Sequence, residues 1–190
     1  MSDFVCIGNK SQFAIEYVIC KKTPYLMGRM CLWVNDLYIG NIEEDVMLLT
    51  VKHYFYVKMS QPEHLRRNEF KLMKPEEVYR YIFDVEYDHT RYLLNICESF
   101  DDFSTVIYIL EGNVNLIWKL YEDASNKYPE YPLSLNSSSI DFDHFSNVVN
   151  QFISDINDEN DEYNNSINNI LFFYITYYRC FRRLSNESNK

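Results

Sequence analysis

The sequence predicts an α+β fold, in which an N-terminal antiparallel β-sheet packs against helices and a C-terminal α-helical hairpin follows. The chain has 190 residues, which is long enough for one well-buried core. Its hydrophobic fraction of 47% and aromatic fraction of 17% provide enough burial to offset the entropy cost of ordering the chain. Only 4 glycines and 5 prolines interrupt it, which favours long elements over a many-turned sandwich or barrel. We therefore expect residues 1–190 to form a single domain, with a sheet-rich core at 1–125 and helices at 140–185 packed on it.

The first 40 residues have the pattern of a strand meander. Segments 4–7, 13–20 and 25–34 are rich in β-branched and aromatic residues, and polar turns separate them. Asn35-Asp36 then predicts a two-residue hairpin that leads into a strand at 37–40.

The middle of the chain alternates helix and strand signals. Three acids at 43–45 precede a helical apolar stripe, so we expect a helix over 43–59 that Pro62 ends. Pro75 followed by two glutamates predicts a second helix that ends near Phe83. The remaining expectations are strands at 91–96, 104–110 and 115–121 and a loop at 126–139.

The last 50 residues predict two helices. Apolar residues from Phe142 to Ile156 recur every three or four positions, and Asp141 precedes them as a candidate N-cap. An acidic break at 157–162 follows. Residues 163–184 predict a final helix that packs back on the first as a hairpin.

The charge of the chain favours a protein partner. The formal net charge is −10, which repels nucleic-acid backbones and anionic membranes and attracts a basic protein. The candidate partner-binding residues are the acids of two segments: Glu98, Asp101, Asp102, Asp155, Asp158, Glu159, Asp161 and Glu162. Tyrosines near acids are typical of polar interfaces, although we expect more than half of them to lie in the core or sheet. They are Tyr79, Tyr81, Tyr87, Tyr92, Tyr108, Tyr121, Tyr128, Tyr131 and Tyr163.

The sequence suggests no catalytic, cofactor or metal site. The alternating acids of residues 84–88 have the spacing found at the start of an EF-hand calcium-binding loop. His89, however, occupies the position where such a loop needs glycine. Asp101-Asp102 and the Asp141/Asp143 pair fit a turn and a helix cap better than an acid–base pair. The five cysteines form no C-x-x-C pair, and we expect buried free thiols. The N-terminus has no secretory signal, so we expect a cytoplasmic protein. No nucleophile-elbow, P-loop or dinucleotide-binding motif occurs, so we expect a protein that is not an enzyme.

The N-terminal half resembles a known family. The run from Ile7 to Tyr17, followed by Gly28, by 32–36 and by Ile39-Gly40, resembles the Imm42-type immunity proteins of bacterial polymorphic toxin systems. Residues 100–103 and 117–119 are also similar, so the resemblance covers roughly 4–152, and the helix from Tyr163 onward looks like an addition. Trp33, Gly28 and Gly40 are interpreted as residues that the fold needs.

The resemblance implies a protein that binds a cognate toxin domain and neutralises it stoichiometrically, without a cofactor. The partner would be the C-terminal domain of the toxin. We expect this domain to be basic, and a nuclease is one candidate for it. The alternative is a non-enzymatic adaptor whose C-terminal helical hairpin docks on a constitutive partner. A hydrolase that uses Asp101 or Asp141 is a third hypothesis.

Overall fold

The computed structural model describes residues 3–21, 25–83 and 89–158. The chain divides into two compact units, Met1–Ser154 and Asp155–Lys190. The organisation of 1–190 as a single domain stays a prediction. The helix expected at 163–184 lies outside the described residues.

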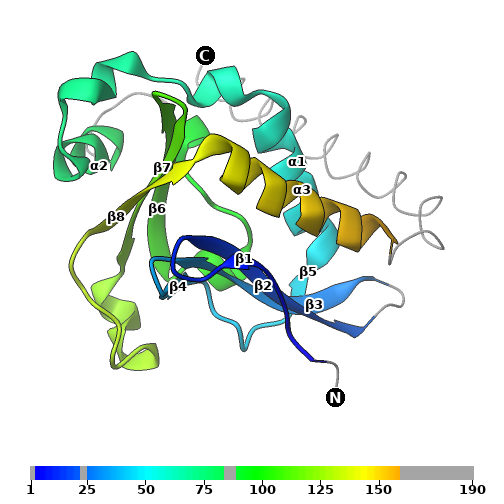
Figure 1. Cartoon of the computed structure of the whole chain (residues 1–190). Coiled ribbons are helices and arrows are strands. Elements are labelled where there is room, and N and C mark those ends of the chain that lie inside the picture. The colour runs from blue at the N-terminus through cyan, green and yellow to red at the C-terminus, as the bar shows by residue number, and fades with distance from the viewer. Residues whose placement is uncertain (1–2, 22–24, 84–88, 159–190) are drawn as a thin grey trace, which may run out of the picture. The chain divides into compact units, whose positions relative to one another are not determined.

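The N-terminal sheet is the predicted meander. Its strands β1 (Val5–Asn9), β2 (Phe13–Lys21), β3 (Met27–Val34) and β4 (Leu37–Ile39) pair in sequence order, all antiparallel (Figure 1). The two-residue hairpin is confirmed, since Val34 pairs with Leu37 across Asn35 and Asp36. Both turn residues have positive φ, 51° and 62°, which is the backbone that a twisted two-residue hairpin needs.

The first helix begins later than predicted. Helix α1 spans Leu48–Ser60, and the acids expected in its first turn lie in a turn before it. The reason is tertiary: β5 (Val46–Met47) pairs with Met27 and Gly28 of β3, which holds the chain extended until Leu48. Helix α2 (Pro75–Phe83) agrees with the prediction, and two 3₁₀ turns, η1 (Pro62–Leu65) and η2 (Asn68–Leu72), connect the helices.

A second, three-stranded antiparallel sheet has the order β6 (Phe103–Leu110), β7 (Asn113–Leu120) and β8 (Asn136–Asp141). The strand expected at 91–96 is wrong, because a 3₁₀ turn η3 (Thr90–Tyr92) stands there with a single bridge from Leu93 to Val106. The loop expected at 126–139 is wrong in its last part, which is β8. Two further 3₁₀ turns, η4 (Glu98–Phe100) and η5 (Glu122–Lys127), flank the β6–β7 pair.

Helix α3 (Phe142–Asp158) follows β8 directly, and Asp141 caps it as predicted. The backbone N–H of His144 donates to Asp141 Oδ1 over 2.9 Å. The helix covers one face of the N-terminal sheet beside α1 (Figure 1). Its Phe145 ring stacks on Phe13 at 4.5 Å between centroids, and Phe152 contacts Tyr17 of β2. This face is the main apolar core of the unit.

An aromatic cluster joins the two sheets. Tyr38 of β4 lies 5.3 Å from Tyr131 between ring centroids, and Tyr131 lies 5.2 Å from Phe103 of β6. The Trp118 indole donates to the Tyr131 hydroxyl over 2.9 Å, so the buried ring carries a satisfied polar atom. The cluster fixes the beginning of β6 next to β4, and three of the candidate acids, Glu98, Asp101 and Asp102, lie at this junction.

Candidate partner-binding surface

Three of the candidate acids lie immediately before β6. Glu98 opens η4, Asp101 follows its last residue as the C-cap, and Asp102 leads into the strand. Glu98 and Asp101 are exposed, whereas the Asp102 carboxylate is only 19% exposed. The short 3₁₀ turn therefore presents two of the three acids to solvent.

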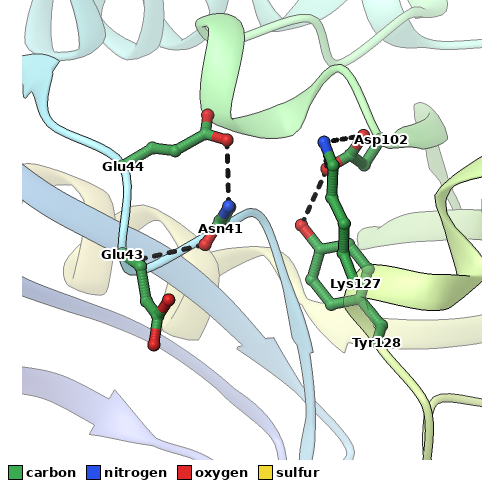
Figure 2. A network of polar contacts seen from close by, with 6 residues as sticks. All are labelled: Asn41, Glu43, Glu44, Asp102, Lys127 and Tyr128. Atoms are coloured by element: carbon green, nitrogen blue, oxygen red, sulfur yellow. Dashed lines mark hydrogen bonds and ion pairs between the residues drawn. The ribbon is translucent and has the colours of Figure 1, made fainter.

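Asp102 is engaged within the protein. The Lys127 ammonium lies 3.0 Å from each of its carboxylate oxygens, and the Tyr128 hydroxyl donates to Oδ2 over 3.0 Å (Figure 2). The hydrogen bond from Lys127 raises the pKa of that lysine, and burial, followed by the bond to Asp102, raises the pKa of Tyr128. Asp102 thus fastens η5 to the start of β6, and a partner would have to compete for an occupied carboxylate.

A second pair of acids, which the sequence assigned to a helix, lies beside this network. The side-chain oxygen of Asn41 accepts a hydrogen bond from the backbone N–H of Glu43 over 3.0 Å. The side-chain amide nitrogen of Asn41 donates to the Glu44 carboxylate over 2.9 Å (Figure 2). The Asn41 N–H also donates to the Ser99 carbonyl over 2.7 Å, which ties this turn to η4. Glu43 is exposed, and Glu44 adds a negative charge near Lys127 and Tyr128.

Together these groups form an acidic corner, which we define as Glu43, Glu44, Glu98, Asp101, Glu122 and Asp123. Tyr121, which immediately precedes Glu122 and Asp123 of η5, donates its backbone N–H to the Asp102 carbonyl over 3.0 Å, so the η5 acids lie near the η4 acids. Sequence reasoning found only the η4 acids of this corner, because the contact between 41–44 and 98–101 depends on how the two sheets meet. Such a surface can pair with lysine or arginine side chains of another protein.

The acids of the second candidate segment lie elsewhere in the chain. Asp155 and Asp158 belong to the last turns of α3, and Glu159, Asp161 and Glu162 lie outside the described residues. Their role in partner binding stays a prediction.

Among the described residues, no three histidine, cysteine or acidic side chains gather as metal ligands, and no helix is long and apolar enough to cross a membrane. The expectation of buried thiols is wrong for Cys6 and Cys20, which are exposed at the ends of β1 and β2. It is right for Cys31, whose pKa burial raises to about 12.

The tyrosine expectation agrees with the structure within the described part of the chain. Tyr92, Tyr108, Tyr128 and Tyr131 are buried, and Tyr79 and Tyr81 are half-buried. Tyr121 is 43% exposed at the acidic corner. Tyr87 and Tyr163 lie outside the described residues.

Comparisons with known proteins identify the family and the fold. The sequence model of the family described as Immunity protein 42 matches residues 1–155. Among solved structures, the chain is similar to CdiI from Burkholderia dolosa AUO158, with a TM-score of 0.60 and 16% identity. That similarity covers 80% of this chain and 99% of the other, and at this identity it concerns the fold. No curated protein matches the sequence.

Proposed function

Because the chain belongs to the Immunity protein 42 family, we propose that it neutralises a cognate bacterial toxin domain by direct, stoichiometric contact. The family match over residues 1–155 carries the proposal, and it covers the whole first unit, including both sheets and the acidic corner. Binding alone suffices for such a role, so the chain needs no catalytic group of its own.

The proposed contact surface is the acidic corner. Its exposed carboxylates at Glu98 and Asp101 are available to a partner, and the net charge of −10 adds a long-range attraction for a basic surface. A toxin domain with a basic site, such as the nucleic-acid-binding site of a nuclease, has the complementary chemistry. Occupation of that site by acids would exclude its substrate.

Co-expression of the chain with the toxin domain tests this proposal. We expect the wild-type chain to restore growth and to co-purify with the toxin. We also expect Asp101→Lys to slow association about tenfold at low salt, because charges at the rim of an interface act mainly on the association rate. The difference should shrink in 0.5 M salt, where the Debye length falls to roughly 4 Å.

Glu63→Lys is the matched control, because it changes the net charge by the same amount. Glu63 is exposed on η1, next to Arg66, which bridges to Ile109 near the far end of β6 from Asp101. Equal slowing by both substitutions would show that only total charge matters and would contradict the acidic corner. Failure of the wild-type chain to rescue growth or to bind would contradict the proposed function itself.

A further inference from the structure

A groove opens beside the acidic corner, between α2, β7 and the segment that precedes β8. It has a volume of about 390 Å³, and its walls include Tyr79 and Arg80 of α2, Lys119 of β7 and Leu133. Leu133 is 46% exposed, and Phe83, whose ring lies 4.6 Å from that of Tyr79, is 39% exposed. Apolar side chains thus face solvent around a concave site, which is unusual for a surface without a partner.

The tyrosine in the groove wall is held in place from below. The Tyr79 hydroxyl lies 2.5 Å from the Ser104 hydroxyl, which itself donates to the Lys119 carbonyl over 3.2 Å. The Ser104 hydroxyl therefore contacts the Tyr79 hydroxyl and the Lys119 carbonyl together. Ser104 is 2% exposed on β6, so a buried strand residue fixes an aromatic ring at the surface.

Tyr121 links the groove to the acidic corner. It follows Lys119 by two residues, and its backbone N–H donates to the Asp102 carbonyl over 3.0 Å. The Ser104 hydroxyl also interacts with its side chain, as do the charges of Asp101 and Asp123. Aromatic rings that are fixed before binding lose little entropy in a complex, and tyrosines of this kind often dominate binding energy.

The charges around the groove indicate the chemistry of its occupant. Glu76 lies in its wall, and Glu122 and Asp123 are exposed beside Tyr121. Of the two cations in the wall, Lys119 lies 3.6 Å from the Glu122 carboxylate, which offsets its charge. Counted together, the three acids Glu76, Glu122 and Asp123 exceed the two cations Arg80 and Lys119 by one charge. This small negative excess suits lysine or arginine beside an apolar anchor.

We infer that this groove is the anchor site of the complex, and that it receives an apolar side chain of the toxin domain flanked by basic residues. The inference rests on the proposed function and adds the part of the interface that supplies affinity. The acidic corner then guides association, while Tyr79, Tyr121 and Leu133 slow dissociation.

Titration calorimetry of the full chain with the purified toxin domain tests the inference. Leu133→Lys places a cation at the rim, and Tyr121→Ala removes the ring that links groove and corner. Each substitution should raise the dissociation constant about tenfold or more, as loss of an interface anchor does. Circular dichroism of both variants should match the wild type, since both side chains are exposed.

Leu72→Lys is the control, because Leu72 is a 93% exposed leucine at the end of η2. Its neighbour Lys71 pairs with Glu111 at the β6–β7 turn, at the opposite end of those strands from Ser104. We expect this variant to bind like the wild type. Folded Leu133→Lys and Tyr121→Ala chains that bind with unchanged affinity would overturn the groove while leaving the proposed function intact.

Two other results also overturn the inference. A wild-type chain that does not bind the toxin removes the proposed function and the anchor site with it. A Leu133→Lys chain that loses self-association in sedimentation but keeps its toxin affinity assigns the groove to a second copy of the chain.

Discussion

Gly28 lies where two strands and a helix converge. It pairs with Ile19 of β2 on one side and with Val46 of β5 on the other, while Leu48 of α1 packs over it. An added Cβ would meet the Val18 carbonyl oxygen and would lie 2.6 Å from Leu48 Cδ1. This glycine is required by close approach of the backbone, as the sequence suggested for the fold residues.

Gly28→Ala should therefore lower the free energy of unfolding by about 3 kcal/mol, at the upper end of the cost of overpacking, because a backbone atom cannot move aside as a side chain can. Urea denaturation followed by circular dichroism measures the loss. Gly112→Ala is the control: nothing lies within 4 Å of its Cβ position, so only its φ of +81° is strained, at roughly 1 kcal/mol. A loss at Gly28 no larger than that at Gly112 would contradict the packing described here.

At the scale of elements, the sequence pattern predicted those parts that local chemistry determines. The meander at β1 to β4, the proline-led α2 and the capped start of α3 each have their own signal. Strand β8 has none, because Asn136 to Asp141 contains a run of three serines and is extended only through its pairing with β7. The delayed start of α1 and the acidic corner likewise depend on contacts between distant segments.

The cap of α3 offers a test at this scale. Asp141→Ala removes the acceptor of the His144 N–H and should lower the free energy of unfolding by about 1 kcal/mol. Asp141→Asn keeps a cap and should cost clearly less. If instead Asp141 were a catalytic carboxylate, both substitutions would abolish an activity and leave thermal stability unchanged.

At the scale of the whole molecule, buried thiol and phenol groups predict that the folded state loses stability in alkali. Burial raises the pKa of Cys31 to about 12 and of Cys97 to about 11, and it also raises the pKa values of Tyr54 and Tyr131. The unfolded chain releases these protons at lower pH than the folded one, so stability is fully present below pH 9, where unfolded thiols begin to ionise, and falls above it. Lys58 opposes this fall between about pH 8 and 10.5, since burial lowers its pKa to about 8.

We therefore expect the free energy of unfolding to decrease above about pH 10, where the tyrosines of the unfolded chain also ionise. Urea titrations at half-unit steps from pH 8 to 11 measure the slope. Cys31→Ala should flatten it by about 1.4 kcal/mol per pH unit between pH 9 and 11, the value for one proton. An unchanged slope in that variant would show that Cys31 ionises alike in both states.

We propose that the molecule as a whole acts by binding the toxin domain and blocking its site, with the acidic corner and the groove on one connected surface. The most direct measurement of that claim is a titration of the toxin domain's activity with the purified chain. We expect a linear loss of activity that ends at one equivalent, together with a complex of equal proportions on size-exclusion chromatography. Full toxin activity in excess chain would contradict neutralisation by contact, and inactivation by a small fraction of an equivalent would contradict a stoichiometric mechanism.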